Sequence, residues 1–215
     1  VKYVSTGTTG DTFGHGLGAV PDTIWFKSLT TQSWNCFFPN TFMGGTKGMQ
    51  VDNQGAAADV THMNNTMPTS TVITLGANQA ATNPFADGVG QAFIVYCWKN
   101  IEGFSKIGEY EGSNNAASGT FVNCGFRPAY LMIKNADAAD TDWSVLTSKI
   151  DTNNPVSTPS FLDASAAEQS GVASNSIDFT SNGFNQRNAD IRFNDPQTYV
   201  FMAFAETPFK YANAR

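Results

Sequence analysis

The chain contains one phrase twice, and this repeat constrains the fold more than any other feature. "GLGAVPDTIWFK" spans residues 16–27, and "GFRPAYLMIK" spans residues 125–134. In each copy, glycine precedes a proline, and an apolar run follows that ends in a lysine. Pro21 and Pro128 are 107 positions apart, and so are Lys27 and Lys134. Glycine and proline ahead of a short aromatic and aliphatic run predict a turn that leads into a β-strand.

Four further pairs of segments follow in the same order. Trp34 matches Trp143, and Gln91 matches Gln197, so the spacing stays close to 107 residues. We therefore predict two tandem homologous units, residues 1–105 and 106–215. Such a period is too long for a solenoid repeat and fits a duplicated β-domain. The pairs are "SWNCFF" (33–38) with "DWSVLT" (142–147), "VDNQGAAAD" (51–59) with "FLDASAAE" (161–168), "STVITLG" (70–76) with "NSIDFTSNGF" (175–184), and "GQAFIVYCW" (90–98) with "PQTYVFMAF" (196–204).

Short apolar runs bounded by turn residues predict the strands of the second unit. Within "SIDFTS", Ile177 and Phe179 alternate with polar residues, which is typical of a half-buried strand. The run 198–205 is apolar on both faces and predicts a central, covered strand. Only residues 164–173 favour a short helical turn. The predicted strands lie near 106–111, 120–124, 129–134, 143–147, 159–163, 176–180 and 198–205.

These patterns predict an all-β protein, an antiparallel β-sandwich of jelly-roll or concanavalin-like type. One merged sandwich and two separate ones both remain open. Charged residues make up 14% of the chain, against about 25% in an average domain. Threonine, serine, asparagine and glycine take their place, as expected of strands and turns.

Charge and hydropathy exclude two classes of partner. The net charge is −6 and there is no basic patch, which argues against nucleic-acid binding. The longest apolar runs, such as residues 93–98, are far shorter than the ~20 residues of a membrane helix. The opening stretch lacks the apolar segment of a signal peptide. We expect neither membrane insertion nor a nucleic-acid partner.

The three cysteines, Cys36, Cys97 and Cys124, show no CxxC spacing. Cys36 and Cys97 lie inside apolar runs, which predicts buried free thiols, with one disulfide left open as an alternative. Few cysteines without a metal-binding pattern fit a chain made in a reducing cytoplasm.

Candidates for catalysis are few. His15 lies in a glycine-rich turn and His62 in a polar loop, and no GxSxG, HxH or HExxH pattern occurs. We expect both histidines to be structural or to face solvent. No pair stands out among Glu102, Glu109, Glu111 and Glu168, as a glycosidase would require. We therefore predict no enzyme and assign no catalytic residue.

Metal and phosphate sites are equally weak. Asp137, Asp140 and Asp142 could offer oxygens to Ca²⁺, but their spacing is not that of an EF-hand, so a solvated acidic turn is favoured. "MGGTKG" (43–48) lacks the phosphate-loop pattern and predicts a hairpin or loop. We assign no metal ligand, no cofactor and no cofactor-binding residue.

The aromatic residues allow two interpretations. All four tryptophans, Trp25, Trp34, Trp98 and Trp143, lie in apolar strands and are expected in the core. Aromatic side chains in loops, on a polar and weakly charged surface, could instead stack on sugar rings. A merely solvated surface is the alternative.

Several phrases resemble a family of β-rich modules in phage tail fibre and tail-associated proteins of the marine and cyanobacterial type. They are "GLGAVPDTIWFK", "GFRPAYLMIK", "ASAAE", "SNGF" and "YVFMAFAETPFKYANAR". The resemblance covers most of both units and departs in the first, where S-x-GF shrinks to "TLG". It implies a concanavalin-like lectin sandwich and a trimer on the external surface of a virion, made in the host cytoplasm. Other virion proteins and host-surface glycan are the implied partners, and no catalytic residue is carried over.

Three functions follow as hypotheses. The first is a phage virion structural protein, a tail fibre or tail-associated module that adheres to host-surface glycan or protein. The second is a capsid decoration or fibre spacer with a purely architectural role. The third, which the sequence supports least, is a polysaccharide-degrading enzyme. The identity of the receptor and a tail or capsid position stay open.

Overall fold

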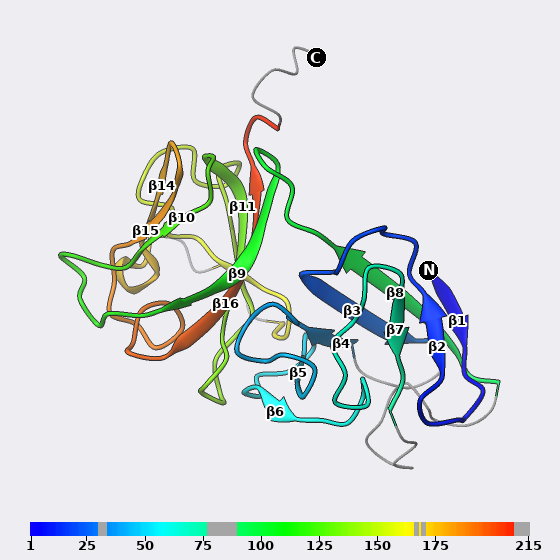
Figure 1. Cartoon of the computed structure of the whole chain (residues 1–215). Helices are drawn as coiled ribbons and strands as arrows, with labels where there is room; N and C mark the ends of the chain where they lie inside the picture. Colours follow the sequence, from blue (N-terminus) through cyan, green and yellow to red (C-terminus); the bar gives the residue numbers. More distant parts are fainter. Residues whose placement is uncertain (30–33, 77–89, 166–167, 169–170, 209–215) are drawn as a thin grey trace. The chain divides into compact units, whose positions relative to one another are not determined.

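The computed structural model describes residues 1–29, 34–76, 90–165, 168 and 171–208 (Figure 1). In these residues the regular structure is β-strand, apart from a 3₁₀ helix at Ala173–Asn175. Every strand pairing is antiparallel, and the sheets pack as sandwiches. The all-β antiparallel sandwich is therefore confirmed, while a jelly-roll or concanavalin-like type stays a prediction. Within the described ranges, no helix has the length and apolar character needed to cross a membrane.

The chain divides into two compact units. The first unit comprises residues 1–52 and 57–99, and the second comprises residues 53–56 and 100–215. The division falls after Lys99, six residues before the predicted end of the first unit at 105, and a short segment from the first half belongs to the second unit. Five strands of the first unit's larger sheet come, in order, from residues 2–4, 92–98, 23–28, 34–37 and 47–50. The larger sheet of the second unit takes its strands from residues 105–111, 198–205, 128–135, 144–147 and 160–161, so the strand order repeats. This shared order supports the inference that the units are homologous.

In the first unit, a six-stranded sheet packs against a two-stranded one. Phe13 and Ile73 of the smaller sheet join Phe26, Phe37 and Val95 of the larger sheet in one core. The larger sheet, in order, is β1 (Lys2–Val4), β8 (Ala92–Trp98), β3 (Thr23–Ser28), β4 (Trp34–Phe37), β5 (Lys47–Gln50) and β6 (Ala58–Asp59). The smaller sheet is β2 (Thr12–Gly14) with β7 (Val72–Thr74).

In the second unit, a five-stranded sheet packs against a three-stranded one. The larger sheet, in order, is β13 (Ser160–Phe161), β12 (Ser144–Thr147), β11 (Pro128–Asn135), β16 (Thr198–Ala205) and β9 (Ser105–Glu111). The smaller sheet is β10 (Phe121–Asn123), β15 (Gly183–Gln186) and β14 (Ile177–Thr180).

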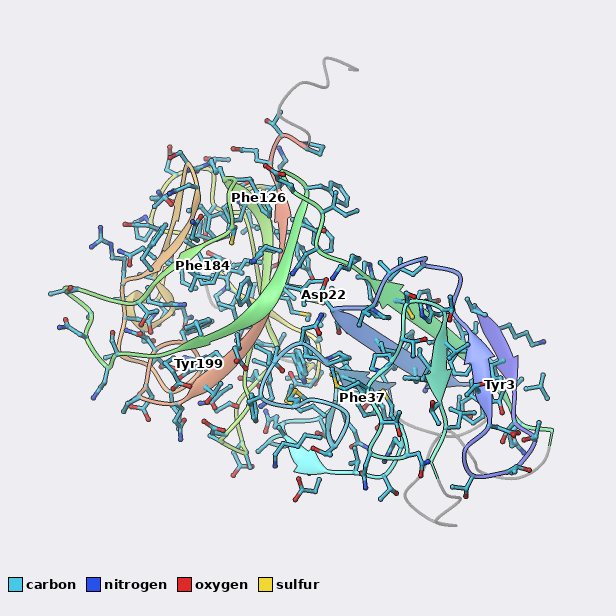
Figure 2. The ribbon with its side chains drawn as sticks, in the orientation of Figure 1. Tyr3, Asp22, Phe37, Phe126, Phe184 and Tyr199 are labelled. Atoms are coloured by element: carbon cyan, nitrogen blue, oxygen red, sulfur yellow. The ribbon has the colours of Figure 1, made fainter. Side chains whose placement is uncertain are left out.

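Aromatic side chains fill the core of the second unit. The rings of Phe184 and Phe201 meet edge to face at 5.3 Å, and those of Tyr110 and Tyr199 stack at 5.0 Å. Figure 2 labels Phe184 and Tyr199 of this core. The buried Tyr110 hydroxyl donates to the Phe193 carbonyl at 2.7 Å and accepts from Gln186 Nε2 at 2.9 Å. The buried Tyr110 hydroxyl thus has hydrogen bonds that compensate for lost water.

The repeated phrase builds the same local structure in both units. Gly18 and Gly125 have φ values of 71° and 80°, a left-handed conformation that side chains other than glycine rarely adopt. Each glycine precedes the central strand of its sheet, β3 or β11. A second shared device follows, because the backbone N–H of the matched tryptophans donates to an aspartate. Trp34 donates to Asp52 at 3.2 Å, and Trp143 donates to Asp163 at 3.1 Å.

The strands predicted for the second unit are all present, with no end shifted by more than two residues, and the strand 198–205 has the predicted bounds. Ile177 and Phe179 of β14 are fully buried, as their alternation predicts. In β16, the five residues 199–203 are all buried, which confirms a central strand covered on both faces. The sequence did not single out β15 as a separate strand. The predicted helical turn at 164–173 lies partly outside the described residues.

Candidate functional site

Both histidines are buried and serve the fold. His15 is 5% exposed, and its Nδ1 accepts the Leu17 N–H at 3.2 Å, so Nε2 carries the proton and donates to the Thr69 carbonyl at 3.1 Å. His62 is 7% exposed and lies 5.8 Å from the Phe37 ring. Burial lowers the pKa of His62 to about 4. The alternative of solvent-facing histidines is therefore wrong for both residues.

The acidic turn is occupied by hydrogen bonds within the second unit. Asp137 accepts the Thr198 N–H at 2.8 Å, and Asp142 accepts from Gln54 Nε2 at 2.6 Å. Asp140 is exposed, with a positive φ of 60°. Within the part of the chain described, no group of three or more histidine, cysteine, aspartate or glutamate side chains could hold a metal ion.

A buried lysine supplies the positive charge at this turn. Lys134 closes the second copy of the repeated phrase and has no exposed surface. Its ammonium donates to Thr141 Oγ1 at 2.7 Å and to the Asn135 carbonyl at 2.9 Å. The carbonyl oxygens of Gln54 and Ala138 lie at 3.4 and 3.5 Å. The turn therefore gathers its oxygens around an ammonium group, a role that the sequence did not reveal.

The three cysteines are free thiols. Cys97 packs with the first unit's core. Both cysteines lie on strands that pair with β3, where Cys97 is the register partner of Ile24 and Cys36 is the partner of the next residue, Trp25. Alternating side chains then place the two thiols on opposite faces of the sheet. The disulfide left open by the sequence does not form. Burial raises the pKa of Cys97 to about 11 and that of Cys124 to about 12.

The feature with most functional promise is the face of the first unit's larger sheet that lies opposite the core. We call it the aromatic face. Trp25, Trp34, Tyr96 and Trp98 project from it, and none belongs to the core cluster. Tyr96 is 43% exposed and the three tryptophans are half-buried. Placing all four tryptophans in the core was therefore wrong for three of them, and only Trp143 is fully buried.

Strand pairing assembles the aromatic face. Trp25 of β3 is the register partner of Tyr96 of β8, and Thr23 is the partner of Trp98. Trp25 sits edge-on between two indoles, with its ring centroid 6.5 Å from that of Trp34 and 5.4 Å from that of Trp98. Paired residues share a face, so these rings gather on one surface although they lie far apart in the sequence.

Three of these rings share an orientation. The planes of Trp34 and Tyr96 are 26° apart with centroids at 6.0 Å, and those of Tyr96 and Trp98 are 22° apart with centroids at 5.9 Å. Trp34, Tyr96 and Trp98 thus form a row of similarly oriented rings across the sheet. Beneath this row, the Trp25 Nε1–H is shielded from water and finds no acceptor among the described residues. Such an unpaired donor costs about 1–3 kcal/mol.

The matching face of the second unit differs. Its β11 has Tyr130, Met132 and Lys134 at the outward positions, and β16 has Val200, Met202 and Phe204. Tyr130 and Phe204 are half-buried, with ring centroids 5.8 Å apart, and the other four residues are buried. An exposed ring in the middle of this face is therefore a property of the first unit, where Tyr96 stands at the position that the buried Met202 has in the second. In the sequence, Trp25 and Lys27 fall on one side of their strand and Ile24 and Phe26 on the other, but both sides carry large apolar residues, so this alternation alone does not identify the outward side.

The fold and the face together define a β-sandwich protein with an exposed aromatic surface and no recognised catalytic motif. Residues 1–208 match the family model described as "Domain of unknown function (DUF7483)", and the chain belongs to this family. Comparison with curated proteins and with solved structures gives no match.

Proposed function

We propose that this chain is a structural protein of a phage virion, a tail fibre or tail-associated module that adheres to glycan or protein on the host surface without catalysis. The proposal places it on the external surface of the particle, as a homo-oligomer of trimeric type. The phrases shared with phage tail modules motivate the virion context. The aromatic face is the single observation that carries adhesion.

Two properties of the aromatic face favour binding over a merely structural role. Large exposed aromatic patches mark interaction sites, because most monomers cover such side chains. Trp and Tyr are also the residues that most often anchor interfaces, since they bury much area with few rotatable bonds. The first unit places three tryptophans and Tyr96 on this one surface, outside its core.

Adhesion would act by multivalency. Each aromatic face provides one modest site, and an oligomer presents several sites to a surface that repeats its own ligand. Linked sites raise overall binding by factors of about 10² to 10⁴ when geometry allows simultaneous contact. A weak single site is therefore sufficient for firm attachment of a particle.

Inhibition of phage adsorption tests the proposal. Purified protein should reduce attachment of the phage to its host cells, and Tyr96→Ala should weaken this inhibition. Phe121→Ala is the matched control, because Phe121 is a similarly exposed aromatic residue on the second unit, at 47%. If neither the wild type nor the control competes, and imaging of the virion places the chain on capsid capsomers, the architectural role replaces adhesion.

A further inference from the structure

The charges around the aromatic face narrow the class of ligand. Lys2, Ile94, Lys27 and Trp34 stand in one row across four neighbouring strands, because each is the register partner of the next. The Lys27 ammonium lies 5.9 Å from the centre of the Trp34 ring. Lys2 is exposed and Lys27 is half-buried. Two lysines therefore flank the row of rings formed by Trp34, Tyr96 and Trp98.

The middle of this surface is positive although the chain as a whole is acidic. At the described outward positions of β1, β3 and β8 there are two lysines and no acidic residue, while at the β4 edge the Asp52 carboxylate accepts the Trp34 backbone N–H. The outward residues are Lys2 and Val4 on β1, Thr23, Trp25 and Lys27 on β3, and Ala92, Ile94, Tyr96 and Trp98 on β8. The complete chain carries a net charge of −6. A locally basic patch on an acidic protein attracts a negatively charged partner specifically to that patch.

Resting on the proposed function, we infer that the aromatic face binds an anionic glycan, a chain of sugar rings that bear carboxylates. The apolar C–H faces of pyranose rings pack against Trp34, Tyr96 and Trp98, whose neighbouring ring planes differ by 26° and 22°. The carboxylates of the glycan lie against Lys2 and Lys27. The combination selects a ligand with both features, because rings alone would hold neutral sugars and lysines alone would hold any polyanion.

Nucleic acid also combines rings with negative charge, but the chain opposes it. Binding along a phosphate backbone depends on many cationic contacts. The aromatic face offers two lysines, and the whole chain has a net charge of −6. A longer nucleic acid would therefore meet more repulsion from the rest of the surface. A spaced carboxylate on each sugar requires fewer cations for the same row of rings.

The test uses the full chain and three soluble polymers. Polygalacturonate supplies sugar rings with carboxylates, dextran supplies neutral sugar rings, and poly-L-glutamate supplies carboxylates without sugar rings. Binding is measured by affinity electrophoresis and by tryptophan fluorescence, because three of the four tryptophans lie at this face. We expect polygalacturonate to bind at least fivefold more tightly than either control polymer, with affinity that falls as salt is raised.

Two variants separate the contributions. The double variant Lys2→Gln/Lys27→Gln should weaken binding of polygalacturonate at least fivefold, and Tyr96→Ala at least threefold. Lys149→Gln and Phe121→Ala alter exposed residues of the second unit and should leave affinity unchanged. Circular dichroism and thermal unfolding establish that each variant is folded before its affinity is compared.

The other outcomes overturn the inference in distinguishable ways. If dextran binds as tightly as polygalacturonate and the lysine variants do not weaken it, the ligand of the aromatic face is a neutral glycan. If poly-L-glutamate binds as tightly as polygalacturonate, the face recognises negative charge and not sugar rings. Loss of all polymer binding with retained inhibition of adsorption rejects the anionic glycan and leaves adhesion standing. Loss of both rejects adhesion as well. An oligomer in size-exclusion chromatography that Tyr96→Ala dissociates means that the aromatic face binds a second copy of the chain instead.

Discussion

Replacing His62 with glutamine should remove much of the acid sensitivity of the first unit. His62 is 7% exposed, and burial lowers its pKa from 6.5 to about 4. The unfolded chain therefore binds a proton at a higher pH than the folded chain. As pH falls from about 6.5 to about 4, protonation of His62 in the unfolded chain lowers the free energy of unfolding. Above pH 6.5, His62 has no such effect on stability.

The size of the effect follows from the two pKa values. One pKa unit corresponds to about 1.4 kcal/mol, so complete protonation of the unfolded state alone costs about 3 kcal/mol. Between pH 7.5 and pH 4.5, we expect the wild type to lose about 2.5 kcal/mol more unfolding free energy than His62→Gln. Glutamine is polar and does not titrate, so carboxylates contribute equally to both proteins and cancel in the difference.

Urea unfolding at a series of pH values provides the measurement. Trp25, Trp34 and Trp98 lie in the first unit and only Trp143 in the second, so tryptophan fluorescence reports mainly the unit that contains His62. The unfolding free energies of the two proteins should converge as pH falls. The slopes of unfolding free energy against pH should differ only between pH 6.5 and pH 4. Parallel curves, or an NMR signal assigned to His62 that titrates near pH 6.5 in the folded protein, would refute the reasoning.

Three further predictions concern packing, hydrogen bonding and thiol chemistry. Gly183→Ala should lower the free energy of unfolding by about 3 kcal/mol or more, because the new Cβ would lie 1.9 Å from the Val122 carbonyl oxygen. Gly108→Ala is the control, because its Cβ would lie 3.4 Å from the nearest atom of the Phe201 ring. It should change the free energy of unfolding, measured by chemical denaturation, by less than about 0.5 kcal/mol. Equal losses would contradict this. Tyr110→Phe should cost about 1–3 kcal/mol in the same assay because it leaves buried hydrogen-bonding partners unpaired, and Tyr96→Phe, at an exposed site, should cost almost nothing. Burial raises the pKa of Cys124 to about 12, so its thiol should react with a disulfide reagent at pH 8 only on unfolding. Mass spectrometry identifies which cysteine is labelled, and rapid labelling of Cys124 in the native protein would count against its burial.

Much of the fold could be predicted from the sequence because the signals for it are local. Glycine at a left-handed turn, proline before an apolar run and alternation such as Ile177 and Phe179 each act within a few residues. Their recurrence at a fixed spacing then predicted two units, and the strand order of the two larger sheets repeats. The segment 53–56, which belongs to the second unit, could not be predicted because the Gln54 contacts are with residues about 80 positions away.

The candidate site could not be predicted in the same way. The runs around Trp25 and Tyr96 are apolar at both parities, so the sequence alone does not decide which side chains face the core. Pairing between β3 and β8 decides it, because a shift of one residue would exchange the two faces. The same applies to the lysines of the repeated phrase. Lys27 lies beside Trp34, whereas Lys134 is buried among loop oxygens.

The sequence by itself determined that this chain forms antiparallel strands in two similar units, because turn chemistry and side-chain alternation are properties of neighbouring residues. Only the tertiary structure decided that three tryptophans and Tyr96 gather outside the core, that both histidines are buried and that Lys134 organises the acidic turn. These outcomes depend on which distant segments meet, and burial, charge and register act on a residue only once those segments have come together.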